Sequence, residues 1–450
     1  MSGSNISQEY FYALADFATG HLQGTEIFTA YLIAENSDFI RFNHGKIRQP
    51  GSIVQANLQL RLMQDVEQHP KQSSITIGLV GDVAYDQQLV AQSLKSLRST
   101  FAYISVDPHL LINTTVQNSE HIEENQLGSV EDMVDDIIHH SDGLDCVGIL
   151  ANGGIFHGFA NSLGQRNWFA SYSFNWDWSL VHSVDKAVKT SYAGKQWNTT
   201  QYIDKMNLAK QQLQMLSRPS KTLDTGEYRA YLSPVALWEI LELISWGGFG
   251  LASHKNKTTP LLHLLEGNHT LSTKFSLFED VGGGCTPNFQ ADGFLRPPTV
   301  SLIEQGRLTG ALVSPRSAKE FSTQTTGASS AETPDSLLVS AGTLAKSDII
   351  STLDTGVYIG NLWYLNYSDR AAGRMTGMTR FATFWVENGE IVAPINVMRF
   401  DDTISRMLGA SLEAVTAETE FLLSSSTYFH RSTGSARLPG VLLNSFRFTL

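Results

Sequence analysis

The sequence predicts an α+β protein with two domains, an N-terminal one built on a mixed sheet with helices and a β-rich C-terminal one. With 450 residues, 42% of them hydrophobic, the chain is long enough for two or three domains with sizeable cores. Helical and strand-like patterns alternate in the first half, whereas strand-like patterns between Gly, Asn and Asp turns dominate the second. The polar stretch SRPSKTLDTGEY, at 217–228, is typical of a linker, so we place the domain boundary near residue 222, giving domains 1–222 and 223–450.

The first half is predicted to combine helices with strands. Apolar residues at helical spacing predict helices at 7–22, 82–97, 130–140 and 202–216. Asp82 precedes the second of them and fits the N-cap position. Apolar or alternating runs predict strands at 27–33, 54–62, 74–79 and 146–150, followed by two long strand-like runs as far as Val181. The segment SDFIRFNHGKIRQ, at 37–49, places Asn43, His44 and Gly45 between two alternating runs and therefore predicts a hairpin.

An aromatic run with a period of two lies in the last of these strand-like stretches. One face carries Trp168, Tyr172, Phe174, Trp176 and Trp178, and the other carries Ser171, Ser173, Asn175 and Asp177. We interpret the aromatic residues as the core face of a sheet. The alternative is a stacking platform for a peptide or for bases.

The second half is predicted to open with a strand and one helix before it becomes β-rich. A strand at 228–232 leads to Ser233 as N-cap and Pro234 at the first helical position, and the helix runs to about Trp246 before Gly247 and Gly248. Further strands are predicted at 270–278, 300–304, 308–313, 356–365, 380–386, 391–397 and 441–448. The Ser-, Thr- and Gly-rich stretch at 322–334 predicts a long exposed loop.

Charge and composition disfavour several classes of function. The formal net charge of −12, without a run of Lys or Arg, argues against direct binding of nucleic acid. We expect no membrane span and no secretory signal, because long apolar stretches are missing and the start lacks a basic segment followed by an apolar one. Two cysteines, Cys146 and Cys285, fit a reducing compartment, so we expect a cytoplasmic protein.

The common catalytic motifs are missing. The sequence contains no HExxH, no Walker A motif and no GxSxG elbow, and its glycine groups lack the strand, turn and helix order that would hold a phosphate. Cys285, in VGGGC, is a candidate nucleophile, but a thiol without a reactive role is the favoured interpretation.

One group of residues has the composition of a metal site. It consists of His263, Glu266 and His269, with His254 a little earlier in the chain. Gly267 and Asn268 are expected to end the helix between the second and third of these residues and so to break the ligand geometry. We therefore favour solvated surface residues and keep the metal site as the alternative.

Five segments together resemble the TldD/PmbA family, whose members have also been called modulators of DNA gyrase. These segments are SDFIRFNHGKIRQ (37–49), FANSLG (159–164), DGFLRPPTVSLIEQGRLTGALVSPRSA (292–318), GRMTGMTRFATFWVENGEIVAPI (373–395) and SARLPGVLLNSFRF (435–448). They occur in the family's order and span most of the chain. The resemblance implies a metallopeptidase-like protein concerned with proteolysis or peptide maturation.

In catalytic members of this family, a helix near the start of the C-terminal domain carries HExxxH, and a cysteine near the C-terminus adds a further zinc ligand. The corresponding helix here is SPVALWEILELISWGGFG. Matching Glu239 to the motif's Glu puts Trp238 and Leu243 at the two histidine positions. No cysteine follows Cys285, and around 429–432 His430 is the residue that could coordinate a metal.

This pattern is similar to the PmbA or TldE branch of the family. The resemblance implies a subunit without zinc that pairs with a zinc-bearing TldD-like chain and acts on unfolded peptides. A homodimer is the alternative assembly, and no cofactor is expected in this chain. Two other functions stay open: an active metal-dependent hydrolase that uses the His263 group, and a regulatory protein that binds gyrase.

Overall fold

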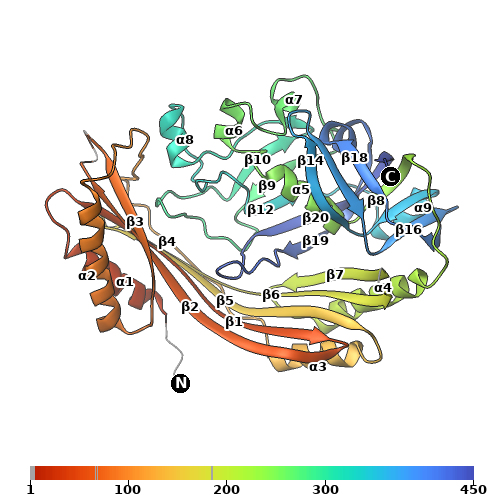
Figure 1. The fold of residues 1–450 in the computed structure, drawn as a ribbon, viewed down its shortest axis with the longest axis horizontal. Helices are drawn as coiled ribbons and strands as arrows, with labels where there is room; N and C mark the ends of the chain where they lie inside the picture. Colours follow the sequence, from red (N-terminus) through yellow and green to blue (C-terminus); the bar gives the residue numbers. More distant parts are fainter. Residues whose placement is uncertain (1–5, 66, 68, 184–185) are drawn as a thin grey trace.

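The computed structural model describes residues 6–65, 67, 69–183 and 186–450, so the first five residues of the predicted N-terminal domain lie outside the described part. Its architecture is α+β, as predicted. The long strands of the first half form a curved sheet that passes beneath the β-rich second half, and helices lie on the outer side of this sheet (Figure 1).

Seven strands of the described chain form the N-terminal sheet. Their bounds are β1 (Ile27–Asn43), β2 (Lys46–Gln64), β3 (Lys71–Gly78), β4 (Ser119–Ile122), β5 (Cys146–Asn161), β6 (Arg166–Ser183) and β7 (Lys186–Gly194). The order is β3-β2-β1-β5-β6-β4, and β7 also pairs with β6. Strands β4 and β6 are parallel whereas the other neighbours are antiparallel, so the sheet is mixed, as predicted.

The predicted hairpin is confirmed, although its strands are longer than expected. His44 and Gly45 form the turn with φ values of 52° and 68°, the positive values that a two-residue hairpin turn favours. The separate strands predicted at 27–33 and 54–62 are parts of β1 and β2. Because β1 pairs with β2 on one side and with β5 on the other, its backbone stays extended through the polar middle at 35–38, where the sequence has no strand signal.

Four helices of the first half cover one face of this sheet. They are α1 (Gln8–Thr19), α2 (Val83–Thr100), α3 (Val130–His140) and α4 (Thr199–Leu216). The predicted cap is confirmed, since the Asp82 side chain accepts a hydrogen bond of 2.9 Å from the backbone N–H of Tyr85. Helices α1 and α2 pack on β1 and β2, and α3 and α4 pack on β5 and β6.

The aromatic run forms a core face, as we interpreted it. Trp176 and Trp178 are fully buried, their rings stack at 5.4 Å between centroids, and Tyr202 of α4 packs against Trp178. The opposite face is buried as well, although its side chains are polar. Ser173 and Asn175 lie beneath the second half of the chain, so a polar layer separates the two halves at this point.

The second half forms a sheet of thirteen strands within the described residues. Its bounds are β8 (Gly226–Leu232), β9 (Leu277–Asp280), β10 (Thr299–Glu304), β11 (Arg307–Leu308), β12 (Ser336–Val339), β13 (Gly356–Ile359), β14 (Leu362–Asp369), β15 (Arg374–Thr379), β16 (Thr383–Glu387), β17 (Glu390–Pro394), β18 (Arg399–Thr403), β19 (Leu412–Leu423) and β20 (Ser435–Phe448). The central order is β11-β10-β9-β12-β20-β8-β13-β16-β17. The helices are α5 (Pro234–Ser245), α6 (Leu251–Lys255), α7 (Leu262–Leu265), α8 (Pro315–Glu320) and α9 (Ile349–Leu353).

Several predictions for this half are wrong in detail. The strand predicted at 270–278 exists only as β9, the one at 308–313 shrinks to β11, and the one at 356–365 is divided into β13 and β14. The stretch at 380–386 is a strand only in β16, and 391–397 only as far as the end of β17. The prediction has no counterpart for helices α6, α8 and α9 or for strands β12, β15, β18 and β19. Edge and crossover strands depend on distant partners, so local pattern sets their bounds poorly.

The loop predicted at 322–334 has neither helix nor strand, as expected, but it is not exposed throughout. Glu332 is buried, and its carboxylate accepts hydrogen bonds from the backbone N–H groups of Ala252 at 2.9 Å and Ser314 at 2.8 Å. These two hydrogen bonds tie the end of the loop to the start of α6 and to Ser314.

The two halves share apolar packing. The cluster built on α3, α4 and β6 includes Ala382 and Phe384 of the second half. Within the described chain, no helix combines the length and the apolar character needed to cross a membrane.

Candidate functional site

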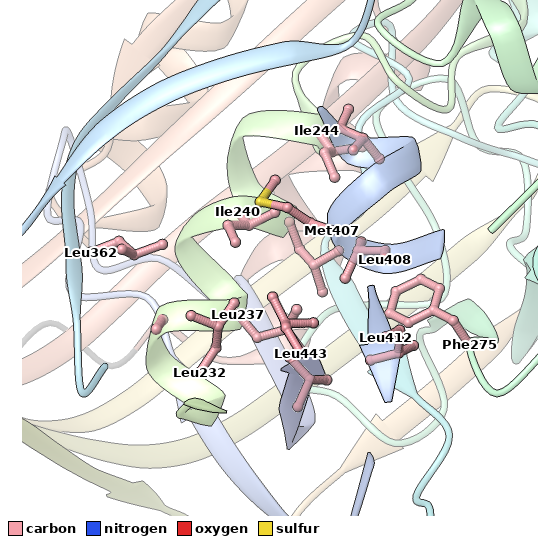
Figure 2. Close-up of a cluster of buried hydrophobic side chains, with 14 of the residues drawn as sticks. Leu232, Leu237, Ile240, Ile244, Phe275, Leu362, Met407, Leu408, Leu412 and Leu443 are labelled. Atoms are coloured by element: carbon pink, nitrogen blue, oxygen red, sulfur yellow. The ribbon is translucent and has the colours of Figure 1, made fainter. Parts of the chain in front are cut away.

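Helix α5 occupies the centre of the second half. Leu237, Ile240 and Ile244 lie on one face of the helix and point into the core toward Leu443 of β20 and Met407 (Figure 2). Helical spacing of these apolar residues therefore fixes which side chains of α5 point away from the core.

Ser233 begins the helix as predicted. Its hydroxyl accepts a hydrogen bond of 3.2 Å from the backbone N–H of Ala236 and donates one of 2.6 Å to the carbonyl oxygen of Gly360, and Pro234 occupies the first turn. These two bonds fix the start of α5 relative to the loop between β13 and β14.

We expect Ser233→Ala to lower the free energy of unfolding by about 1–2 kcal/mol, because the substitution removes both hydrogen bonds. Ser233→Thr keeps a hydroxyl and serves as the control. Urea titration followed by circular dichroism measures the difference, and an alanine variant as stable as the wild type would contradict this assignment of the cap.

The side chains at the two predicted histidine positions lie in different surroundings. Trp238 is half-buried and lines a groove, whereas Leu243 packs against the apolar core of the second half. The backbone carbonyl of Leu243 accepts a hydrogen bond of 2.8 Å from the hydroxyl of Tyr367. Both side chains take part in packing, and neither carries an atom that binds zinc.

Glu239 serves as a half-buried hydrogen-bond acceptor. Its Oε2 accepts a hydrogen bond of 2.6 Å from the backbone N–H of Leu362, at the start of β14. Burial raises its pKa from the ordinary value of 4.5 to about 8, although this hydrogen bond acts in the opposite direction. At neutral pH the side chain is therefore mostly protonated.

The groove beside α5 has a cavity volume of about 490 Å³. Three segments line it, and their residues are Trp238, Glu242, Ser245 and Trp246; Thr333, Pro334, Asp335 and Leu337; and Ser424, Ser426, Tyr428, His430, Ser432, Thr433, Gly434 and Ser435. The structure thus brings Trp238 and His430 to one groove, although they are far apart in the sequence. We call it the α5 groove.

The third wall of the α5 groove is the loop at 424–434, between β19 and β20. His430 lines the groove, and burial lowers its pKa, so the ring is neutral at neutral pH. The next residue, Arg431, points the other way into the polar layer between the halves. Its guanidinium donates hydrogen bonds of 2.7 Å to the carbonyl oxygens of Ser173 and Gly153.

A carboxylate of the first half also binds this loop, and together with the hydrogen bonds of Arg431 it forms the anchor of the loop. The backbone N–H of Arg431 donates a hydrogen bond of 3.1 Å to Oε2 of the buried Glu35. The side chain of Gln55 donates to the other carboxylate oxygen of Glu35 and, at 2.7 Å, to the carbonyl oxygen of Phe429. The loop that carries His430 is therefore held by strands β1, β2, β5 and β6.

The residues present around α5 do not fit a bound zinc ion. Trp238 and Leu243 offer no donor atom, and Asp335 forms an ion pair of 2.7 Å with Arg296. Across the residues that the structure describes, no three His, Cys, Asp or Glu side chains lie close enough together to hold a metal ion.

The alternative group around His263 does not have the geometry of a metal site either. Helix α7 ends at Leu265, so His263 and His269 do not share a helix face, although their rings lie 5.0 Å apart between centroids. Glu266 is exposed and pairs with Lys257 at 3.0 Å.

His254 differs from the expected surface residue. It is buried, and its Nε2 lies 2.7 Å from the carbonyl oxygen of Gly248, within hydrogen-bonding distance. The short helix α6 turns this ring inward, which the isolated sequence did not indicate. Cys285 is also buried, and burial raises the pKa of its thiol, which disfavours the reactive thiolate.

Sequence reasoning missed four polar residues of this region. Glu242 and Ser245 lie about one and two turns beyond Trp238 on the groove side of α5, and they could have been found by extending the helix periodicity from Trp238. Glu35 and Arg431 meet across 396 positions of the chain, and no local pattern indicates such a contact.

Comparison with known proteins agrees with this architecture. A family profile described as the PmbA/TldA metallopeptidase C-terminal domain matches residues 225–450. A search of curated proteins found no significant match.

Three solved structures share the fold over nearly the whole chain. TldE from Thermococcus kodakarensis is 15% identical, with a TM-score of 0.78, and the match covers 98% of this chain and 100% of that one. A candidate modulator of a DNA gyrase from Thermotoga maritima is 14% identical, with a TM-score of 0.73 and coverage of 98% and 100%. A candidate modulator of DNA gyrase from Bacteroides thetaiotaomicron is 15% identical, with a TM-score of 0.69 and coverage of 99% of both chains.

The fold and the profile match together define a metallopeptidase-like protein of the two-sheet α+β type. The chain belongs to the PmbA/TldD family. The resemblance drawn from the five sequence segments is thereby confirmed.

Proposed function

We propose that this chain is a TldE/PmbA-like subunit of a TldD/TldE-type metallopeptidase, and that it does not carry zinc itself. In this assembly a TldD-like partner supplies the zinc ion and the hydrolytic chemistry. This chain supplies walls of the chamber that receives unfolded peptide, together with the surface that contacts the partner. A homodimer is the alternative assembly.

The proposal rests on the residues that stand at the zinc-motif positions of helix α5. Trp238 and Leu243 stand at the positions where catalytic members of the family have histidines, and both side chains pack in the fold. Glu239, at the position of the general base, is bound to the backbone N–H of Leu362 at 2.6 Å. Without a metal-bound water within reach, this carboxyl group has no proton to remove.

The α5 groove supports a role in holding peptide. It retains an open volume of about 490 Å³ beside the degenerate helix, and its rim carries the exposed side chains of Trp246 and Tyr428. Aromatic side chains beside polar groups are a common composition of peptide-binding surfaces.

Reconstitution with a TldD-like chain tests the proposal. The two chains are purified separately and mixed at micromolar concentration, and light scattering coupled to size exclusion gives the mass of the complex. Cleavage of an unfolded polypeptide such as reduced casein is then followed for each chain and for the mixture. We expect a stable complex, cleavage by the mixture, and none by this chain alone. A strictly monomeric chain that ignores the partner, or one that cleaves casein by itself, would overturn the proposal.

A further inference from the structure

We propose that the α5 groove is a subsite for a basic side chain, Lys or Arg, of an extended peptide. This inference deepens the proposed function and rests on it, since it names the chemical class of residue that the peptide-binding wall selects. Charge, aromatic lining and an unpartnered hydroxyl support it independently.

The charge of the groove favours a cation. Of its two carboxylates, that of Asp335 is paired with Arg296 at 2.7 Å, whereas Glu242 lies on the open side of α5. Burial raises the pKa of Glu242 whereas the positive charge of Lys189 lowers it, and the Lys189 ammonium lies 3.9 Å from the carboxylate of Asp177. An acidic peptide side chain would face the Glu242 carboxylate, whereas a basic one would neutralise it.

Aromatic rings line the same groove as this carboxylate. Trp238, Trp246 and Tyr428 line the groove, and Trp246 and Tyr428 are 67% and 85% exposed. Tryptophan and tyrosine rings attract ammonium and guanidinium groups through their negative faces. The Trp246 ring already has the guanidinium carbon of Arg370 at 5.9 Å from its centroid, while the NH groups of Arg370 donate to the carbonyl oxygens of Thr258 and Trp246.

A buried hydroxyl points to a ligand at the same place. Ser245 lines the groove and is 8% exposed, and within the described chain its Oγ has no hydrogen-bond partner. A buried hydroxyl without a partner costs free energy, which a bound donor would recover. An ammonium or guanidinium group that reaches Glu242 from the groove can also donate to Oγ of Ser245, one turn further along α5.

The composition of the groove also disfavours an apolar occupant. An aliphatic side chain would cover the Glu242 carboxylate without offering it a hydrogen bond, so this group would lose water without compensation, and Oγ of Ser245 would stay without a partner. The aliphatic stem of Lys or Arg can pack on the aromatic rings while its charged end binds the polar groups, so such a side chain suits both the aromatic and the polar residues of the groove.

Peptide binding tests this inference on the full chain. The probe is a fluorescein-labelled, acetylated and amidated peptide of about ten residues, Gly- and Ser-rich, with one central Lys. Matched peptides carry Arg, Gln, norleucine or Glu at that position, and fluorescence anisotropy gives each dissociation constant. We expect the Lys and Arg peptides to bind about tenfold more tightly than the Gln and norleucine peptides, and the Glu peptide to bind most weakly.

Three variants assign the preference to the groove. Glu242→Gln should reduce the Lys-to-Gln ratio to about one, and Ser245→Ala and Trp246→Ala should each reduce it roughly threefold. Glu304→Gln, the same charge change on exposed β10, and Trp363→Ala, which removes an exposed aromatic side chain of β14, are the matched controls and should leave the ratio unchanged.

The outcomes separate this inference from the proposed function. Equal binding of all peptides, binding of none, or a Lys preference that survives Glu242→Gln would overturn the basic subsite. A preference for a free peptide amine over the Lys side chain, seen when the acetyl group is omitted, would also overturn it. Complex formation with the TldD-like chain is measured for the wild type and for Glu242→Gln. If neither protein forms the complex, the result counts against the subunit role and not against the basic subsite.

Discussion

Replacing Arg431 by alanine is expected to lower the free energy of unfolding by about 3–5 kcal/mol. Arg431 is 2% exposed, and its guanidinium binds the carbonyl oxygens of Gly153 and Ser173 in the polar layer between the halves. Burial lowers its pKa to about 10, so the group is still charged at neutral pH. The alanine variant would remove both hydrogen bonds and leave the carboxylate of Glu35 without this nearby positive charge.

Denaturant titration, followed by both tryptophan fluorescence and circular dichroism, measures this loss. Arg431→Lys keeps the charge but not the forked geometry, so we expect it to recover part of the stability. Ser432→Ala, one residue further along the same loop, controls for a general effect of substitution there. A stability of Arg431→Ala within about 1 kcal/mol of the wild type would show that the loop is not held by this anchor.

The second large effect is a pH dependence that belongs to Glu239. Burial raises the pKa of this carboxyl group from 4.5 to about 8, so between these values the folded chain holds a proton that the unfolded chain has released. Its contribution to stability is therefore present at low pH and is lost as the pH rises from about 4.5 through about 8. Glu239→Gln keeps the acceptor for the Leu362 N–H and removes the titration.

We expect Glu239→Gln to gain roughly 2–4 kcal/mol relative to the wild type between pH 5 and pH 8. The free energy of unfolding is measured at half-unit steps of pH, and only the difference between the two proteins is interpreted, because other groups titrate in both. Glu304→Gln, on an exposed strand, is the control. A difference that stays constant with pH would mean that Glu239 is ionised in the folded chain at neutral pH.

Local sequence predicted the elements whose signals are local. The cap at Ser233, the turn at His44 and the aromatic core face of β6 each depend on residues within a few positions of one another, and the structure has all three. The family resemblance then identified α5 as the helix to inspect. This identification of α5 rests on the five segments that occur in the family's order, and not on a signal within the helix itself.

The rest of the site depends on contacts between distant parts of the chain. The α5 groove exists because the loops near 334 and 430 return to one side of α5, and neither loop has a sequence pattern that indicates this. The Arg431 loop covers the polar face of β6, a contact that the sequence pattern does not indicate. The half-buried position of Glu239 is likewise a property of the assembled fold, since an amphipathic helix would place a Glu on its surface by default.

Elemental mass spectrometry of this chain, purified without a metal-affinity tag or a chelator, tests the proposed subunit role most directly. We predict much less than one zinc per chain, with the metal instead on the TldD-like partner when the complex is analysed. About one zinc per chain, lost when His430 or His263 is replaced, would contradict the account and assign the metal chemistry to this protein.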